Sequence, residues 1–327
     1  MRQFLDLALE TIPRVLGGTD RDSTAESYGS CDRQYWHYRL HDMSNARLQE
    51  AGLLFALAYS IDSPENPFFR SQKLLAWIRG VWRFWLADRN SDGSCSEVYP
   101  NERSFCATAF SAAGFCETIR LTGGDAGWQQ ELVDAKKTIA WLAMNTNPDV
   151  ANQMAASALA LQAWKKLSGD DEFSAVSQRR ISDCIALQND SGVFPEYGGF
   201  DTGYQTITMS VLACLLKWLP KNSLEAVDVL SALKKAEQAV NRVVDDKGGI
   251  DESACSRNTD YLYPHAFAAL KSSVLQRIET GLSGRSVLRP TWMDDRYCIA
   301  LAADYLYAFR ELAHVDDDIP AHSTAPV

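Results

Sequence analysis

The sequence predicts an all-α protein whose helices form an α/α toroid, which is a closed ring of helix pairs. Apolar residues recur at helical spacing along almost the whole chain, and no segment shows the alternation of a β-strand. Two kinds of helical segment alternate, one rich in bulky side chains and one rich in small residues. Turns that contain Asn, Asp and Gly recur between them.

The chain begins with an amphipathic helix, in which apolar residues recur at Leu5, Leu9, Ile12 and Leu16. Asp6 and Glu10 interrupt the apolar run, whereas a secretory signal has an uninterrupted apolar core. No apolar run reaches the length that a membrane-spanning helix needs. We therefore expect no membrane insertion and a cytoplasmic location.

The cysteines support the same compartment. All eight are scattered and none forms a C-x-x-C pair: Cys31, Cys95, Cys106, Cys116, Cys184, Cys214, Cys255 and Cys298. Several lie in apolar helical stretches, where a reduced and buried thiol is the expected state. This pattern does not indicate a disulfide framework.

The helices that follow are expected in pairs. Bulky amphipathic helices are predicted at 66–88, 125–146, 170–188 and 223–244. Helices rich in small residues are predicted to begin near 45, 104, 151, 203, 260 and 296. Their spacing, roughly forty to sixty residues, suits a helix-pair repeat. With the N-terminal helix there are six small-residue helices and five bulky ones, which leaves open whether the sixth pair is complete.

A ring is the arrangement that best accommodates this alternation. Small-residue helices can pack closely on the inside while bulky helices cover them, and a closed ring leaves no end exposed. An open solenoid is the alternative, and it predicts shorter, more uniform repeats without long polar loops. We expect one toroid domain over residues 1–313, no β-sandwich domain, and a flexible tail over 314–327, where periodicity stops.

Three of the turns are followed by a carboxylate. The segments NSDGS (90–94), NDSG (189–192) and DDKGG (245–249) precede Glu97, Glu196 and Glu252. In a ring, the connections that lead from bulky to small-residue helices lie at one end. These glutamates are therefore expected at the mouth of a common cavity.

Aromatic side chains gather on the same connections. Nine of the twelve tyrosines lie there or on the first turns of the small-residue helices, together with Trp36, Trp292 and His37: Tyr28, Tyr35, Tyr38, Tyr99, Tyr197, Tyr204, Tyr261, Tyr263 and Tyr297. Tyr and Trp on a polar loop offer an apolar face and a hydrogen-bonding edge, which suits a sugar ring. Aromatic anchors that merely hold the loops in place are the alternative.

Arginines show a similar bias toward the connections: Arg21, Arg33, Arg39, Arg103, Arg257, Arg285, Arg289 and Arg296. The planar guanidinium suits carboxylate, sulfate or phosphate groups. The chain has a formal charge of −10, which argues against a general binder of nucleic acid or anionic membranes. The arginines therefore point to an anionic ligand, although pairing with Asp32, Glu97 or Asp201 would also explain some of them.

From about residue 140 to 220 the sequence resembles the helical domain of the heparinase II/III-type polysaccharide lyases. In that family an Asn-Asn-His stretch opens an Ala/Leu-rich helix. A second helix, a turn with a glutamate and a Tyr-rich helix start follow it. The corresponding segments here are VANQMAASALALQAW and DDEFSAVSQRRISDCIALQNDSGVFPEYGGFDTGYQTITM.

The resemblance implies that Asn152 neutralises a uronate carboxylate and that Tyr204 is the catalytic tyrosine. The chain departs from the family at two motif positions, where Gln153 replaces the histidine and Ala151 replaces the first asparagine. It also lacks the β-sandwich that usually completes such a lyase. The implied activity is elimination on an acidic glycan or oligosaccharide.

β-Elimination makes definite demands on residue type. An amide or Arg must stabilise the enolate, a base must take the proton next to the carboxylate, and a Tyr can protonate the leaving oxygen. The predicted catalytic residues are Tyr204, Asn152, Gln153, His265 and Glu196. The predicted substrate-binding residues are Tyr35, Trp36, His37, Arg103, Tyr197, Asp201, Arg257, Asp260, Tyr261, Trp292 and Arg296. No cofactor or metal is expected.

Three other functional classes remain open. A glycoside hydrolase needs two carboxylates about 5–9.5 Å apart, for which Glu97, Glu196, Asp201, Glu252 and Asp260 are candidates unless they only cap helices. A toroid that binds glycans without catalysis is the second alternative. A terpenoid cyclase or prenyltransferase is less favoured, because its D-x-D-D or zinc-ligand pattern is missing. His37 and His41 have the spacing of helical zinc ligands but lack a third ligand.

Overall fold

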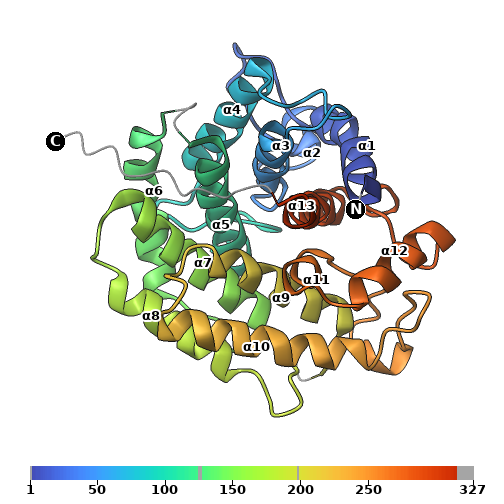
Figure 1. Ribbon diagram of the computed structural model, residues 1–327. Coiled ribbons are helices and arrows are strands. Elements are labelled where there is room, and N and C mark those ends of the chain that lie inside the picture. The colour runs from blue at the N-terminus through green and yellow to red at the C-terminus, as the bar shows by residue number, and fades with distance from the viewer. Residues whose placement is uncertain (1, 124–126, 197–198, 315–327) are drawn as a thin grey trace.

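The computed structural model describes residues 2–123, 127–196 and 199–314. Over these residues it contains thirteen α-helices and no β-strand, which confirms the all-α prediction. The predicted tail lies outside the described residues except for its first residue. Figure 1 shows the helices in order along the chain.

The helices rich in small residues appear where the sequence places them. They are α3 (Ala51–Ser60), α5 (Phe105–Thr122), α7 (Ala151–Ser168), α9 (Thr202–Leu216), α11 (His265–Leu270) and α13 (Asp295–Leu312). Each packs against the next one along the chain, and α13 packs against α3. The contacts of these six helices therefore form a closed series.

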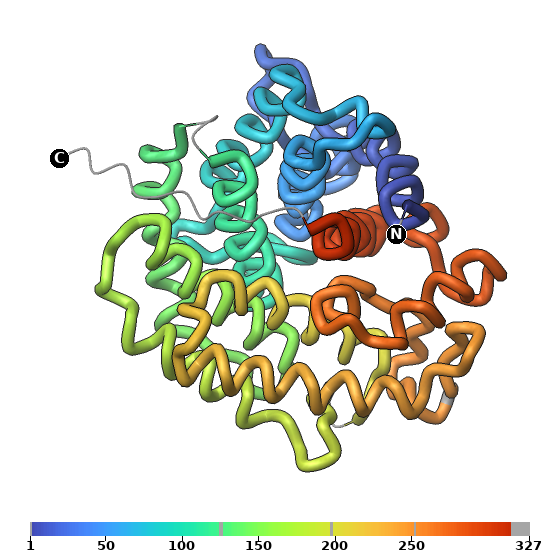
Figure 2. The backbone as a smooth tube through the Cα atoms, in the orientation of Figure 1, coloured from blue at the N-terminus to red at the C-terminus, as the bar shows by residue number. Residues whose placement is uncertain are grey.

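The bulky helices cover this series from outside. They are α1 (Arg2–Gly18), α4 (Gln72–Asp88), α6 (Gln129–Met144), α8 (Ser174–Ala186), α10 (Leu224–Asn241) and α12 (Val274–Gly284). Helix α1 packs on α13, so that the first and last described helices lie side by side in Figure 2, and α4, α8 and α10 pack on α3, α7 and α9. Of the eighteen residues in each helix, fourteen are buried in α7 and seven in α10. The small-residue helices thus form the inner layer.

Short elements complete the chain between these pairs. A four-residue helix, α2 (Arg33–Trp36), precedes α3, and 3-10 turns occupy Leu48–Glu50, Glu252–Ala254 and Pro290–Trp292. Side-chain oxygens cap the amino ends of several helices by accepting a backbone N–H, namely Ser71, Ser104, Asp201, Ser223 and Asp294. The cap at Ser71 starts α4 six residues later than the sequence prediction of 66–88.

The region after residue 260 differs most from the prediction, which placed one small-residue helix there. Residues 261–264 are not helical, and α11 is only six residues long. Pro264 explains the late start, because proline disfavours helical geometry in the residue before it. Lys271 then ends α11 in a left-handed conformation (φ 54°). The following α12 supplies the sixth bulky helix, so the sixth pair, which the sequence left open, is present.

The three turns that precede Glu97, Glu196 and Glu252 have one geometry. In each, the backbone N–H of the first residue, Asn90, Asn189 or Asp245, donates to the carbonyl four residues later. The glycine of each turn has a positive φ of 94°, 87° or 77°. A Cβ there would lie 2.2–2.7 Å from a carbonyl oxygen of the neighbouring bulky helix. The turn therefore needs glycine, and it fixes where each following loop enters the mouth of the fold.

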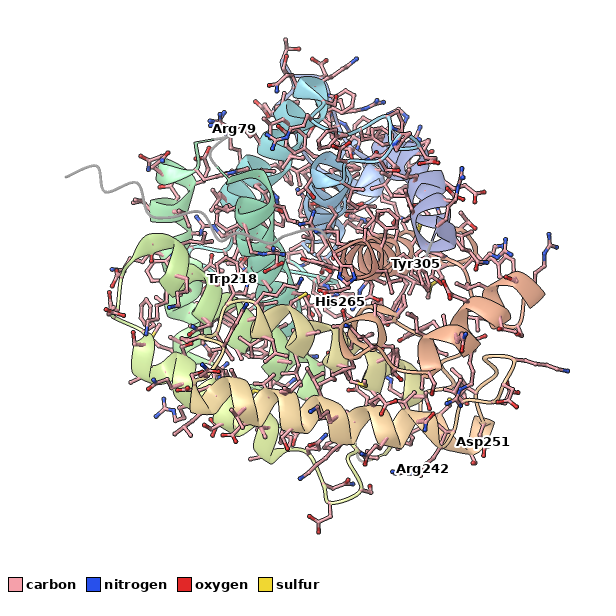
Figure 3. The ribbon with its side chains drawn as sticks, viewed as in Figure 1. Arg79, Trp218, Arg242, Asp251, His265 and Tyr305 are labelled. Carbon is pink, nitrogen blue, oxygen red and sulfur yellow. The ribbon has the colours of Figure 1, made fainter. Side chains whose placement is uncertain are left out.

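A buried carboxylate joins three of the inner helices. Glu117 of α5 forms an ion pair with Arg120 at 2.6 Å. It accepts hydrogen bonds from the Tyr307 hydroxyl of α13 at 2.7 Å and from the Trp218 indole N–H just after α9. Although burial raises the pKa of Glu117, Arg120 and the two hydrogen bonds lower it below the usual value. Figure 3 shows Trp218 directed toward the interior, while Arg242 and Asp251 lie at the outer edge.

We predict that Arg120→Leu destabilises the protein by on the order of 3–5 kcal/mol, because it leaves the Glu117 carboxylate buried without its guanidinium. Adding Glu117→Gln should restore part of this loss, since the uncharged amide can accept from Trp218 through its oxygen and donate to the Tyr307 hydroxyl through its N–H. Urea unfolding followed by circular dichroism measures both effects. Arg83→Leu is the control, because Arg83 is 61% exposed and the buried Glu131 keeps its ion pair with Arg79, so the loss should be under about 1 kcal/mol. An equal loss for Arg83→Leu and Arg120→Leu would contradict the role of Glu117.

Candidate functional site

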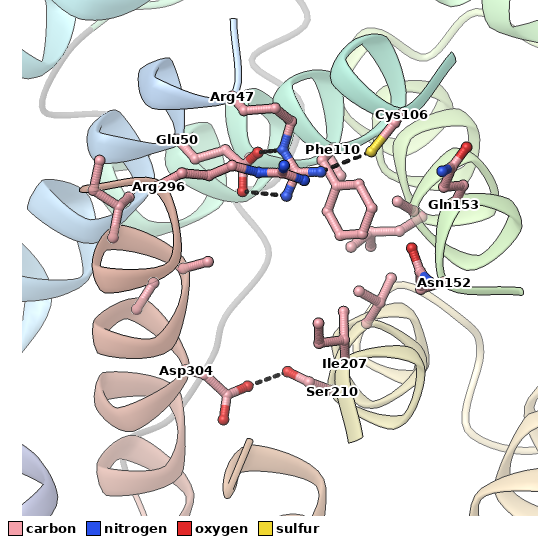
Figure 4. Close-up of a pocket in the computed structure, with 18 of the residues that line it drawn as sticks. Arg47, Glu50, Cys106, Phe110, Asn152, Gln153, Ile207, Ser210, Arg296 and Asp304 are labelled. Atoms are coloured by element: carbon pink, nitrogen blue, oxygen red, sulfur yellow. Dashed lines mark hydrogen bonds and ion pairs between the residues drawn. The ribbon is translucent and has the colours of Figure 1, made fainter. Parts of the chain in front are cut away.

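The inner helices enclose a cavity of about 490 Å³, which is within the size range of small-molecule sites. Residues of α3, α5, α7, α9 and α13 line it, and Figure 4 shows part of its wall. Small side chains such as Ala113, Gly114, Ala156 and Ala303 face it. The small-residue helices therefore pack closely and still leave a hollow, which we call the central cavity.

One wall of the central cavity is built around Glu196. The Asn152 side-chain amide of α7 donates to its carboxylate at 2.8 Å, and the Arg257 guanidinium donates at 3.2 Å. Burial raises the pKa of Glu196 to about 7; the charge of nearby Asp201 adds to the rise, and Arg257 and Asn152 oppose it. The carboxyl therefore exchanges a proton near neutral pH.

Asp201 holds this wall in place. Its side chain caps α9 by accepting from the backbone N–H of Tyr204 at 3.0 Å. The other oxygen accepts from the backbone N–H of Arg257 at 3.0 Å, and Thr259 donates to the same carboxylate. One buried carboxylate thus fixes the backbone of both Tyr204 and Arg257.

Tyr204 lies between Arg257 and a second tyrosine. Its hydroxyl is 2.6 Å from that of Tyr297, and the Arg257 guanidinium carbon is 4.8 Å from its ring centroid. Burial raises the pKa of Tyr204, and the hydrogen bond with Tyr297 raises it further. Tyr204 therefore stays protonated at neutral pH and is suited to donate a proton.

The opposite wall holds two more pairs of charged residues. Arg47 forms an ion pair with Glu50, donates to the Cys106 thiol at 2.9 Å and lies 4.0 Å over the Phe110 ring. Arg296 pairs with Glu97 at 2.8 Å. Figure 4 shows Arg47, Glu50 and Arg296 close together above the hollow. Each arginine that lines the cavity, including Arg257, thus has a carboxylate partner within the protein.

The floor carries a polar cluster on α9, α11 and α13. Ser210 donates to Asp304, and the His265 backbone N–H donates to the same carboxylate at 2.9 Å. The Ser210 hydroxyl lies 3.3 Å from Nδ1 of His265. Burial raises the pKa of Asp304 to about 6, against the charge of His265 and the hydrogen bond from Ser210. Ser210 and Asp304 line the cavity.

The structure brings six of the sequence-predicted site residues together at the central cavity: Asn152, Gln153, Glu196, Tyr204, Arg257 and Arg296. His265 lies behind the floor and is fully buried, with its Nε2 3.4 Å from Glu311. Asp201 caps α9, which is the alternative role that the sequence allowed for the candidate carboxylates. Gln153 accepts from the Asn147 amide at 2.9 Å.

The remaining predicted residues lie elsewhere. Trp36 donates its indole N–H to the Gly18 carbonyl at 2.7 Å, and Tyr35 packs on Phe84. His37 contacts Trp36 with the two rings tilted by 59°. Arg103 is largely exposed and pairs with Asp92 at 3.1 Å. A shallow depression outside the Tyr204 wall contains three more, namely Asp260, Tyr261 and Trp292. Tyr197 and the side chain of Glu252 are outside the described residues.

Sequence reasoning missed Arg47, Glu50 and Asp304, which line the cavity. A signal was present for Asp304, because it is a carboxylate in the middle of the Ala-rich segment RYCIALAADYLYAF. Arg47 and Glu50 are three residues apart at the start of a small-residue segment, so on a helix they share one face. On an inner helix that face can point into the cavity. Charged residues on a predicted inner helix were thus the available indicator.

Two further observations concern the described residues. No group of three or more His, Cys, Asp or Glu side chains among them is arranged to hold a metal ion. Of the helices that the structure describes, none combines the length and apolar character that crossing a membrane requires.

Comparison with known proteins adds no relationship. No model of a protein family matches the sequence, and no curated protein matches it significantly.

The raised pKa of Glu196 predicts a pH-dependent stability difference between the wild type and Glu196→Gln. A carboxyl whose pKa is about 7 when folded and about 4.5 when unfolded binds more protons in the folded state, so its contribution falls as pH rises from 4.5 to 7. The Gln variant should gain on the order of 1–3 kcal/mol relative to wild type across this window. Urea unfolding at pH 4.5, 6 and 8 measures the difference. The carboxyl of Asp304, whose pKa is also raised, is present in both proteins, so its effect cancels in the comparison. A constant difference would contradict the raised pKa.

Proposed function

We propose that the chain is an α/α toroid whose central cavity binds an acidic sugar or oligosaccharide and catalyses β-elimination. One observation carries the proposal: Asn152, Tyr204 and Arg257, which the sequence suggests for this chemistry, line one cavity together with the carboxyl of Glu196. The closed series of contacts among the six inner helices supports the toroid. Eight free cysteines, seven of them buried, support a reducing compartment such as the cytoplasm.

Recognition of a uronate carboxylate is the first step. The Asn152 amide and the Arg257 guanidinium both donate to one carboxylate, that of Glu196. Two donors that converge on a carboxylate within the protein have the geometry to hold one from a ligand. The substrate carboxylate takes the place of Glu196 at Arg257 and Asn152, and Glu196 stays ionised beside the substrate.

Proton transfer is the second step. Ionised Glu196 takes the proton on the carbon next to the substrate carboxylate, and Arg257 with Asn152 stabilises the enolate that develops. The electron pair of that C–H bond forms the new C=C bond, and the bond to the leaving sugar oxygen breaks. Tyr204 donates its proton to that oxygen. The proton held by Glu196 then returns to Tyr204 through solvent, so no water is consumed.

Glycoside hydrolysis is the second candidate, and the carboxyl groups of the cavity favour it. Six line the cavity: Glu50, Glu97, Glu102, Glu117, Glu196 and Asp304. The pKa of Glu196 is raised to about 7, which suits a general acid, and Glu97, which lines the same cavity beside Arg296, is the candidate second carboxylate. Six carboxyl groups against three arginines also favour a ligand with few negative charges over a highly sulfated one.

An assay with uronate-containing oligosaccharides tests the proposal, with unsaturated-uronate absorbance and reducing ends followed together. For a lyase both signals rise, and Tyr204→Phe and Glu196→Gln each lower kcat/KM by on the order of 100-fold or more, because each removes a proton-transfer group. Asn152→Ala should lower it by roughly the same amount through loss of enolate stabilisation.

Tyr99→Phe is the matched control, because Tyr99 is exposed on a loop and does not line the cavity. Its activity should equal that of the wild type. Reducing ends without unsaturation would replace the lyase by the hydrolase. Binding without either signal would leave a glycan-binding protein and overturn catalysis on these sugars.

A further inference from the structure

A second cavity of about 700 Å³ adjoins the central one. It lies among the end of α1, the α2 segment, the segment before α3 and the start of α13. Glu97, Arg296 and Ile299 line both cavities. The two hollows therefore share a wall, and these three residues belong to it.

The shared wall includes the ion pair between Glu97 and Arg296, whose nearest atoms are 2.8 Å apart. Both are long side chains, and about a third of Arg296 is exposed to solvent. Glu97 is only 11% exposed, so a ligand that replaces either partner must supply a polar group that compensates the charge left behind. The junction between the cavities thus presents one guanidinium and one carboxylate to a ligand that extends from one cavity into the other.

The second cavity has the mixed surface that suits a sugar ring. Tyr38 is 55% exposed, and the Arg33 guanidinium carbon lies 5.3 Å from its ring centroid. His41 and Asn45 add hydrogen-bonding groups to the lining. An aromatic face beside polar donors and acceptors is the common arrangement for carbohydrate contact.

This wall is held in a fixed geometry by Asp32. Its carboxylate caps α2 by accepting from the backbone N–H of Gln34 at 3.0 Å. The second oxygen accepts from the backbone N–H of Asn45 at 2.9 Å, thirteen residues further along. The α2 segment is therefore tied to the segment that leads into α3, and the second cavity is preformed.

We propose that the second cavity is a subsite for a further sugar unit of an oligosaccharide whose reacting unit occupies the central cavity. Arg296 and Glu97 contact the chain at the junction, and Tyr38 provides the stacking face. This inference rests on the proposed function and adds that the substrate is an oligosaccharide rather than a monosaccharide. It also gives a role to the aromatic residues of the α2 segment, since His37 packs edge-on against Tyr38 and Trp36 is hydrogen-bonded to the Gly18 carbonyl.

Filling the second cavity tests the proposal. Gly17 lines it, and a Cβ added to Gly17 meets no atom within 4 Å, so Gly17→Phe is a suitable variant for introducing a ring there. Gly284, near the end of α12, also has nothing within 4 Å of an added Cβ and lines none of the four cavities described for the protein. Gly284→Phe is therefore a matched control. Tyr38→Ala is a second test variant, which removes the stacking face without filling the cavity.

The measurement is calorimetric titration with glucuronate, a glucuronate-containing disaccharide and the corresponding tetrasaccharide, in a Tyr204→Phe background that prevents turnover. We expect the tetrasaccharide to bind at least 10-fold more tightly than the monosaccharide. Gly17→Phe and Tyr38→Ala should remove this gain and leave monosaccharide affinity within twofold. Gly284→Phe should retain the gain.

Different failures have different meanings. If the monosaccharide binds and length adds nothing, or if Gly17→Phe retains the gain, the subsite is wrong while the proposed function of the central cavity stands. If none of the three sugars binds any variant, the proposed function fails and the subsite fails with it. Thermal unfolding of each variant checks that Phe at position 17 has not disrupted α1.

Discussion

The fold depends on one buried carboxylate, that of Glu117. Its charge is compensated by Arg120 from its own helix, by the Trp218 indole just after α9 and by the Tyr307 hydroxyl of α13. An uncompensated charge in this position would cost several kcal/mol, so the three donors must stay within reach of it. α5, the end of α9 and α13 are therefore held at fixed positions around the floor of the central cavity. An apolar contact could slide, whereas these directional bonds define where the three helices meet.

The hollow itself follows from side-chain size. Ala113, Gly114, Ala156 and Ala303 let the backbones of the inner helices approach one another and leave space between them. Protein interiors normally fill such space, because unfilled volume forfeits dispersion contacts. Here polar groups border it instead, including Asn152, Glu196, Ser210 and Asp304, and polar groups bordering a cavity can be solvated by water or a ligand. A cavity of this composition lowers the stability of the fold and provides polar groups that can bind a ligand.

The chemistry of the Glu196 wall is set by local structure. Asp201 caps α9 and at the same time holds the backbone of Arg257, so a helix start and a loop some fifty residues later are fixed by one side chain. This places Tyr204 and Arg257 beside Glu196, whose pKa rises because the same packing removes water. The Asp201 cap and the tertiary packing together position the side chains of this wall, and the same packing raises the pKa of Glu196. The ion pair between Glu97 and Arg296 lies at the junction of the two cavities and forms part of the wall of each.

The sequence by itself determined the helices, their alternation and the turns between them. Each of these depends on local properties: helical spacing of apolar residues, caps such as Ser104 and Asp201, and glycines at positions 93, 192 and 248 that a side chain would block. It also indicated Asn152, Glu196, Tyr204 and Arg257 as candidate site residues. Only the tertiary structure decided that these four meet, that His265 lies behind the floor, and that Arg47, Glu50 and Asp304 face the cavity. The orientation of a charged side chain on an inner helix depends on which helices surround it, and that depends on contacts between residues far apart in the chain.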